Sequence, residues 1–241
     1  MEKRLEGRIA LITGASRGIG RAVAKRFAQE GAHPILIART QAALEELDDE
    51  IRSETDIEST LIPLDLRDFD AIDKVGAAIY DRFGRLDVMV ANAGLLGVLT
   101  PLHHFKPKVW DDVMAVNVTA CWRLTRSMDP LLRASDSGRA IYVTSTVGHE
   151  PRAFWGAYAI SKAALDMMSN VYAQETEKTN IRVNIINPGP TRTGMRASAM
   201  PGEDPETLKT ADSIAHEFVN LAASDCTLHG EMIDAKAELI N

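Results

Sequence analysis

The sequence has few cysteines, few aromatic residues and no long apolar run. Its two cysteines, Cys121 and Cys226, lie far apart without metal-ligand spacing. This argues against a disulfide framework and favours a reducing compartment, so we expect both thiols to be buried and unreactive. The N-terminal residues lack the apolar core of a signal peptide, and no stretch approaches membrane-spanning length. We therefore expect a cytoplasmic protein.

An excess of basic charge is also missing. The chain has 27 Lys and Arg against 34 Asp and Glu, a net charge of −7, so it has no general attraction for nucleic acid or an anionic membrane. Its 241 residues, 45% of them hydrophobic, suit a single domain with a large core. We expect one domain over residues 1–241, with neither nucleic acid nor a membrane as a partner.

Short apolar runs alternate with amphipathic stretches along almost the whole chain. This order indicates an α/β fold, in which crossover helices connect the strands of a parallel sheet. The expected strands are Arg8–Ile12, Pro34–Ala38, Thr60–Leu64, Asp87–Ala91, Ala140–Ser145, Arg182–Ile186 and Met232–Asp234. One long stretch, Thr191–Thr210, is expected to be irregular. Loops of that length in a compact domain are usually functional or mobile.

The segment Thr13–Gly20, Thr-Gly-Ala-Ser-Arg-Gly-Ile-Gly, lies between an apolar run and a segment of helical periodicity. Glycine lets the backbone turn sharply and approach phosphate oxygens, while a helix N-terminus offers unpaired N–H groups and partial positive charge. This setting predicts a site for the pyrophosphate of a nicotinamide cofactor. For the glycine spacing alone, a tight turn packed against a helix is the alternative.

Tyr158 and Lys162 are four residues apart, which places them on one face of a helix. A free tyrosine titrates near pH ~10, too high for easy proton exchange at neutral pH. One ammonium about 4 Å away, at an effective dielectric near 20, stabilises the phenolate by roughly 4 kcal/mol, or about three pK units. The pair is therefore a candidate acid/base for a carbonyl or alcohol. The alternative is a surface tyrosine beside a solvated lysine.

Three further polar features support the chemical interpretation. Ser145 ends an expected strand, at the edge where open α/β sheets bind ligands, although an isolated serine there also suits a cap or turn. Another strand ends in the small residues Ala91-Asn92-Ala93-Gly94. Asn117 places an amide in an apolar helical stretch, so it either braces the neighbouring strand or orders a water chain, or does both.

In this order and at these separations, the residues resemble the short-chain dehydrogenases/reductases over nearly the whole chain. The matching pattern is Thr13-Gly14-x-x-x-Gly18-Ile19-Gly20, Asn92-Ala93-Gly94, Asn117, Ser145, Tyr158-x-x-x-Lys162 and Pro188-Gly189. The chain is most similar to the bacterial branch near 3-oxoacyl-acyl-carrier-protein reductase and its uncharacterised oxidoreductase relatives. The resemblance implies a single-domain, doubly wound (Rossmann-type) parallel seven-stranded sheet with helices on both faces.

The resemblance also implies a catalytic tetrad. In such enzymes Tyr158 is the acid/base, Ser145 holds the reacting oxygen, Lys162 lowers the tyrosine pKa and bonds the nicotinamide ribose, and Asn117 keeps a water in the proton relay. The implied cofactor-binding residues are Gly14, Ser16, Arg17, Gly18, Ile19, Gly20, Arg39, Asp65, Leu66, Asn92, Ala93, Gly94, Tyr158, Lys162, Pro188, Gly189, Thr191 and Thr193. Asp65 resembles the residue that contacts the adenine amino group.

Two departures from the family pattern do not support a specific role in fatty-acid synthesis. Ala91 stands where many relatives carry asparagine, and Asp234-Ala235-Lys236 replaces an Asp-Gly-Gly ending. Neither departure touches the implied tetrad.

The end of the second strand predicts the cofactor. An acid there would accept bonds from an adenosine ribose and repel a 2′-phosphate. This chain has Arg39 instead, and Arg17 in the glycine turn is placed to approach from the other side. We expect NADP(H) rather than NAD(H). Solvated surface charges are the alternative for both arginines.

The substrate is predicted only as a class. Thr191–Thr210 resembles the family's variable substrate lid, in which Arg192 and Arg196 are open to three roles: meeting an anionic group, binding the cofactor diphosphate, or neither. The expected substrate-pocket residues are His149, Trp155, Arg192 and Met195. An apolar lining favours a nonpolar or aromatic carbonyl. The adjacent His103 and His104 have no further ligand at suitable spacing, so no metal is expected.

Three functions are compatible with parts of this pattern. An NADPH-dependent oxidoreductase, transferring a hydride between nicotinamide and a carbonyl or alcohol, uses every feature above. A non-catalytic NADP-binding sensor needs the glycine turn but not the tetrad. A nucleotide- or methyl-donor enzyme needs a Walker lysine after the glycines or an acid near Arg39, and the sequence has neither. The resemblance also implies a homotetramer or homodimer that pairs through the helices holding Asn117 and Tyr158.

Overall fold

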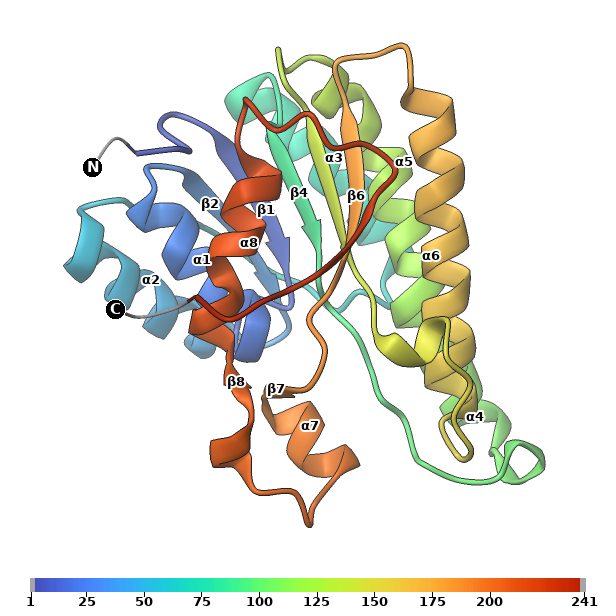
Figure 1. Cartoon of the computed structure of the whole chain (residues 1–241). Helices are drawn as coiled ribbons and strands as arrows, with labels where there is room; N and C mark the ends of the chain where they lie inside the picture. Colours follow the sequence, from blue (N-terminus) through green and yellow to red (C-terminus); the bar gives the residue numbers. More distant parts are fainter. Residues whose placement is uncertain (1–2, 239–241) are drawn as a thin grey trace.

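The computed structural model describes residues 3–238. Seven strands form one parallel sheet in the order β3-β2-β1-β4-β5-β6-β9, and β7 and β8 form a separate parallel pair (Figure 1). The strands are β1 (Ile9–Thr13), β2 (His33–Ala38), β3 (Thr60–Pro63), β4 (Val88–Ala91), β5 (Arg139–Val143), β6 (Arg182–Asn187), β7 (Thr191–Arg192), β8 (Lys209–Thr210) and β9 (Met232–Asp234). The chain winds outward from β1 to β3 and then from β4 to β9, so the sheet is doubly wound as expected.

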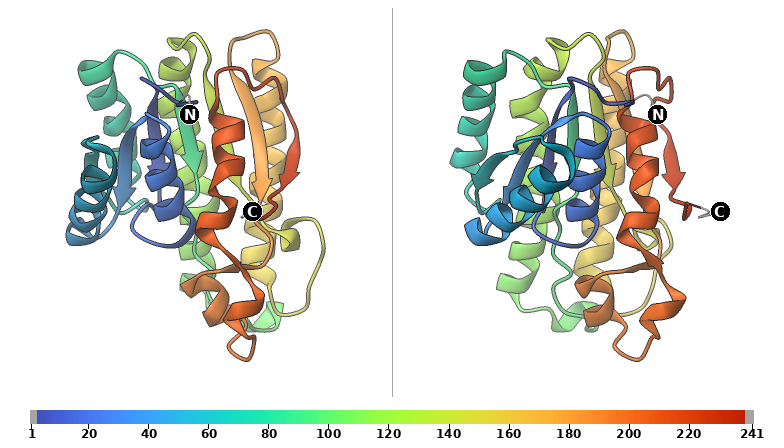
Figure 2. Two further views of the ribbon diagram at one scale, coloured as in Figure 1. Left: turned by 60° about the vertical axis from the view of Figure 1, so that its left-hand side comes forward. Right: turned by 90° about the vertical axis from the view of Figure 1, so that its left-hand side faces the viewer.

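Helices cover both faces of the sheet, which gives the three layers seen in Figure 2. One core cluster joins the sheet to α1, α2 and α8, and the other joins it to α3, α5 and α6. The helices are α1 (Gly18–Gln29), α2 (Gln41–Thr55), α3 (Phe69–Phe83), α4 (Pro107–Met114), α5 (Ala120–Arg133), α6 (Gly156–Thr176), α7 (Gly194–Ala199) and α8 (Ala211–Ala222). Within residues 3–238, none of these helices has the length and apolar character needed to cross a membrane.

Strand β1 shows why the central strands are apolar throughout. Ile9 and Leu11 pack into the layer of α3, α5 and α6, whereas Ala10 and Ile12 pack into the layer of α1 and α8. Side chains alternate between the faces of a strand, and both faces are covered here, so no position is left for a solvated side chain. This double coverage confirms the parallel sheet predicted from the apolar runs.

The expected strands all form, and their ends differ from the expected ones by at most two residues. The largest difference is in β5, which ends at Val143 rather than at Ser145. The Thr144 amide still donates to the Ile186 carbonyl, after which the chain enters a 3₁₀ turn at Thr146–Gly148. Ser145 therefore lies in the turn beyond the strand.

The expectation that Thr191–Thr210 is irregular was wrong. The segment contains β7, α7 and β8. The Thr193 hydroxyl accepts a hydrogen bond from the Arg196 amide and caps α7, while β7 pairs with β8 and closes the base of the segment. Local capping and strand pairing thus satisfy backbone groups in a segment that was expected to have no regular structure.

The two thiols differ in burial. Cys121 is buried within α5, and desolvation raises the pKa of its thiol to about 11. Cys226 is only half-buried, so that expectation was wrong. It lies in the turn after α8, where its carbonyl, rather than its thiol, bonds the Arg139 guanidinium.

Candidate active site

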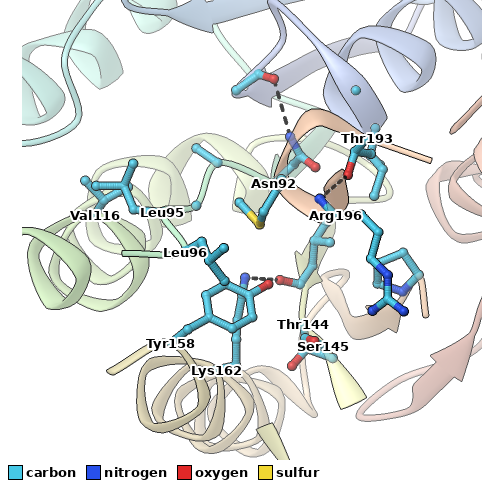
Figure 3. Close-up of a pocket in the computed structure, with 18 of the residues that line it drawn as sticks. Asn92, Leu95, Leu96, Val116, Thr144, Ser145, Tyr158, Lys162, Thr193 and Arg196 are labelled. Atoms are coloured by element: carbon cyan, nitrogen blue, oxygen red, sulfur yellow. Dashed lines mark hydrogen bonds between the residues drawn. The ribbon is translucent and has the colours of Figure 1, made fainter. Parts of the chain in front are cut away.

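A cavity of about 620 Å³ lies along the carboxyl ends of the central strands, where the strand order changes direction between β1 and β4. Open α/β sheets bind ligands at this point, because neighbouring connections there leave on opposite faces. One end of the cavity is formed by the glycine turn after β1 and by the ends of β2 and β3. The other end is formed by α6, α7 and the turn after β5 (Figure 3).

The glycine turn approaches the end of β4 too closely for side chains. Gly14 has φ +68°, and a Cβ there would lie 3.0 Å from the Ala93 Cα and from the Asn92 Nδ2. A Cβ on Gly20 would lie 2.5 Å from the Asn92 Nδ2 and 2.9 Å from the Gly14 carbonyl carbon. Gly20 does not line the cavity, but its lack of a side chain lets α1 begin directly behind the turn.

The N-terminus of α1 is suited to an anion. Its first turn contains no acidic residue, and the side chain of its N-cap, Arg17, makes no capping hydrogen bond among the described residues. The first N–H groups of a helix have no partner within the helix and carry partial positive charge. With Gly18 beside it at φ +58°, this turn fits a diphosphate.

Hydrogen bonds fasten the ends of β1 and β4 to each other. The Thr13 hydroxyl accepts from the backbone amides of Asn92, at 3.0 Å, and Ala93, at 3.1 Å. The Asn92 side-chain amide donates back to the Thr13 carbonyl at 2.9 Å. These bonds hold the floor of the cavity in place.

Arg17 and Arg39 lie at the end of the cavity beside the glycine turn. Both side chains are exposed, and neither forms an ion pair or side-chain hydrogen bond within residues 3–238. Asp65, by contrast, is held by the Arg67 guanidinium at 2.6 Å, which lowers the pKa of the Asp65 carboxyl to about 2. Arg67 was not among the residues expected from the sequence, although its position just beyond the third strand could have indicated it.

Tyr158, Lys162 and Ser145 meet at the middle of the cavity. Tyr158 and Lys162 project from α6 and are 8% and 3% exposed. The Lys162 Nζ donates to the Val143 carbonyl at 2.6 Å and lies 5.7 Å from the centre of the Tyr158 ring. Ser145 faces the same cavity from the turn after β5 (Figure 3). One ammonium, one phenol and one hydroxyl are thus gathered at the edge where ligands bind.

Asn117 is fully buried in a π-helical turn between α4 and α5, outside the cavity lining. Its Oδ1 accepts from the Leu95 amide at 2.7 Å, and its Nδ2 donates to the Leu95 carbonyl and the Ser161 hydroxyl, both at 2.9 Å. Asn117 therefore ties the segment after β4 to α6, which is the bracing role that its sequence context allowed. Gly94 lies next to both Asn117 and Lys162. A Cβ at this position would make ordinary contacts, 3.5 Å from the Asn117 Oδ1 and 3.8 Å from the Lys162 Nζ.

The far end of the cavity is apolar. Trp155, Tyr158 and Ala199 form a small buried cluster, against which several half-buried apolar residues pack. The half-buried members are Leu96, Leu99, Val147, Ala159 and Met200. Met195 also lines the cavity, so the structure brings Trp155 and Met195 to the expected pocket.

Two expected pocket residues lie elsewhere. The His149 imidazole is directed to Asp166, with its Nδ1 3.9 Å from the Asp166 Oδ2, and Arg192 pairs with Glu206 at 2.8 Å. Neither lines the cavity, and a substrate contact for these two residues stays a prediction. Arg196 does line it, but Glu203 neutralises its guanidinium at 2.5 Å.

Most of the remaining expected cofactor-binding residues line the cavity, including those contributed by the segment after β6. They are Ser16, Ile19, Leu66, Ala93, Pro188, Gly189, Thr191 and Thr193. Thr144, Val147 and Arg152 also line the cavity but were not expected from the sequence. Their position after the end of β5 could have indicated them.

The chain is similar in sequence and structure to proteins of a known family. The family model for short chain dehydrogenases matches residues 8–204. The chain is 44% identical, over 92% of its length and 88% of the relative's, to the uncharacterized oxidoreductase YciK of Escherichia coli K12. It is 35% identical to the 3-oxoacyl-[acyl-carrier-protein] reductase FabG of Thermotoga maritima, covering 77% of this chain and 75% of that protein. It is also similar to the crystal structure of a short chain dehydrogenase from Escherichia coli CFT073 complexed with NADPH, with a TM-score of 0.95, 42% identity and coverage of 98% and 99%.

Replacing Gly20 with alanine tests the role of the glycine turn. The added Cβ would lie 2.5 Å from the Asn92 Nδ2, so the turn and the end of β4 must move apart. We expect NADPH affinity, measured by fluorescence titration, to fall at least about tenfold, which corresponds to roughly 1.4 kcal/mol. Gly202→Ala is the matched control, because no atom lies within 4 Å of a Cβ there. Equal NADPH affinities in the two variants would contradict a role of the glycine turn in binding the cofactor.

Proposed function

The chain belongs to the short-chain dehydrogenase family, and from this membership we propose an NADPH-dependent oxidoreductase that transfers a hydride between nicotinamide and a carbonyl or alcohol substrate. The observation that carries the proposal is the meeting of Tyr158, Lys162 and Ser145 in one cavity with the glycine turn. A nucleotide-binding protein without chemistry needs the turn, but it has no need of a buried ammonium beside a phenol. The two free cysteines suit the reducing, cytoplasmic setting proposed for the protein.

Tyr158, Ser145 and Lys162 each have a part in the transfer of one proton. When bound, the nicotinamide supplies or accepts the hydride. In reduction, the Tyr158 hydroxyl donates its proton to the carbonyl oxygen, and the Ser145 hydroxyl donates a hydrogen bond to the same oxygen. The Lys162 ammonium, held by the Val143 carbonyl, favours the phenolate left on Tyr158. In oxidation, the phenolate takes the proton back.

Other residues fit the parts of the cofactor. The unpaired N–H groups at the start of α1 suit the diphosphate, and the guanidinium groups of Arg17 and Arg39 suit a 2′-phosphate. The carboxylate of Asp65 accepts from Arg67 and remains at the adenine end of the cavity. The solved neighbour with NADPH supports this assignment.

The apolar cluster around Trp155 supports a substrate with a nonpolar or aromatic body. We propose that Trp155 and Met195 contact this body while Ser145 and Tyr158 face the reacting oxygen. A panel of β-ketoacyl thioesters, quinones, ketosteroids, aldehydes and sugars with NADPH identifies the class. Tight NADPH binding without turnover of any of them would instead favour the sensor.

Tyr158→Phe tests the assignment of the proton donor. The variant loses only the transferable proton, so we expect kcat to fall about 10²- to 10⁴-fold while the NADPH dissociation constant stays within a few-fold. Tyr80→Phe is the control, since Tyr80 is exposed on α3, away from the cavity. Retention of more than about a tenth of the wild-type rate would exclude Tyr158 as the donor.

Substitution of Arg39 tests cofactor selection. A charge-assisted hydrogen bond contributes roughly 1.5–3 kcal/mol, so Arg39→Ala should weaken NADPH about 10- to 150-fold and leave NADH nearly unchanged. Arg39→Asp adds repulsion of the 2′-phosphate and an acceptor for the NADH ribose, so it should reverse the preference. The measurement is kcat/KM with each cofactor. A wild type that prefers NADH, or an Ala variant that weakens both cofactors equally, would make Arg39 a solvated surface charge.

We propose a homodimer or homotetramer that buries the outer face of α5 and α6. This face exposes large apolar side chains: Trp122, Ile160, Met167 and Val171. Exposed patches of this kind mark association surfaces. Light scattering of the wild type should give at least a dimer, and Met167→Glu should shift it toward monomer because a charge cannot be buried there without a partner. Tyr80→Glu on α3 is the control, and a monomeric wild type at micromolar concentration would contradict the proposal.

A further inference from the structure

Asp166 is a buried carboxyl that the reaction proposed above does not use. It lies on α6 one helical turn after Lys162 and is 7% exposed. Neither of its carboxyl oxygens makes a hydrogen bond within residues 3–238, and the buried hydroxyl of Thr144 has no partner in the same part of the chain. Unpaired buried polar groups are costly and rare. Two of them beside a candidate catalytic lysine therefore call for an explanation.

The turn after β5 packs directly on this part of α6. A Cβ on Gly148 would lie 2.9 Å from the Asp166 Oδ2 and 3.1 Å from the Lys162 Cβ, so only glycine leaves room for the carboxyl. The next residue, His149, brings its Nδ1 to 3.9 Å from the same oxygen, and its side chain is 38% exposed. The carboxyl thus lies beside an imidazole that reaches solvent, one helical turn after the buried Lys162.

Burial and the neighbouring charges have opposite effects on the pKa of Asp166. Burial raises the pKa of the Asp166 carboxyl above its ordinary value, and the charges of Lys162 and His149 act in the opposite direction. Lys162 is on the same helix as Asp166, and His149 is in the turn after β5. Its charge state is therefore coupled to the Lys162 ammonium.

We propose that Asp166 is a positioning residue: its carboxylate, one helical turn after Lys162 where Tyr158 is one turn before it, partly offsets the Lys162 ammonium and so sets how strongly that ammonium favours the Tyr158 phenolate. The proposal rests on the oxidoreductase function proposed above. Tyr158, Lys162 and Asp166 are spaced by four residues each, so the three groups share one face of α6. His149, in the turn after β5, lies beside Asp166 and is partly exposed to solvent.

The pH dependence of carbonyl reduction tests the proposal through Asp166→Asn. Without the carboxylate, the ammonium favours the phenolate more strongly, so we expect the alkaline fall in kcat to move to lower pH. Eight helical residues span about 12 Å, for which one charge at an effective dielectric near 20 gives a shift of up to roughly one pH unit. KM and the NADPH dissociation constant should stay within about twofold. Glu175→Gln removes an exposed carboxylate from the same helix and should leave the profile in place.

The stability of Asp166→Asn, together with its pH profile, separates the proposed role from a purely structural one. The raised pKa means that the stability contributed by Asp166 is present below its ordinary pKa of ~3.9 and is lost as the pH rises through its folded value. Asp166→Asn should therefore be at least as stable as the wild type at neutral pH, as measured by thermal unfolding. Lowered activity at all pH values, with no movement of the alkaline limb, would overturn the proposal.

A direct titration separates this proposal from the proposed function. The Asp166 carboxyl can be followed by carbon-13 NMR in the wild type and in Lys162→Met, neither of which requires a substrate. We expect the midpoint to rise in Lys162→Met, because the variant loses the ammonium that lowers the pKa of Asp166. An unchanged midpoint in folded Lys162→Met would overturn the coupling even if turnover is found. Absence of turnover with a raised midpoint would instead reject the oxidoreductase while leaving the coupling intact.

Discussion

The fastening of β1 to β4 at their carboxyl ends is the constraint on which the candidate site depends. Thr13 and Asn92 exchange hydrogen bonds across this junction, and Gly14 and Gly20 allow the glycine turn to approach within contact distance. The strand order changes direction at the same place, so connections diverge and leave a cavity. Without this junction, the start of α1 would not face the ends of the other strands.

A second set of bonds places the proposed chemistry relative to this junction. Asn117 joins the segment after β4 to Ser161 on α6, and Lys162 bonds the end of β5 through Val143. These bonds hold α6 against two strand ends, which sets the distance from the candidate acid/base to the cofactor end of the cavity. A brace of this kind pre-organises a site because its members are buried and their polar atoms are satisfied.

The electrostatic arrangement differs between the two ends of the cavity. At the glycine turn, Arg17 and Arg39 have no counterion among the described residues, which leaves their charges available to a phosphate. At the end formed by α7, Arg196 is already neutralised by Glu203, and the surrounding cluster is apolar. An anion at one end and a nonpolar body at the other is the occupancy that this distribution favours.

The sequence by itself determined the strands, the glycine turn and the pairing of Tyr158 with Lys162, because strand and helix periodicities are local properties of the chain. It also placed Asn117 in an apolar helix, but its bonds to Leu95 and Ser161 connect segments distant in sequence. Tertiary structure decided that His149 turns to Asp166 and Arg192 to Glu206, away from the cavity. It also decided the order within 191–210, where β7 pairs with β8. The direction of a side chain is set by whichever partner the folded chain brings nearest, and sequence spacing does not contain that information.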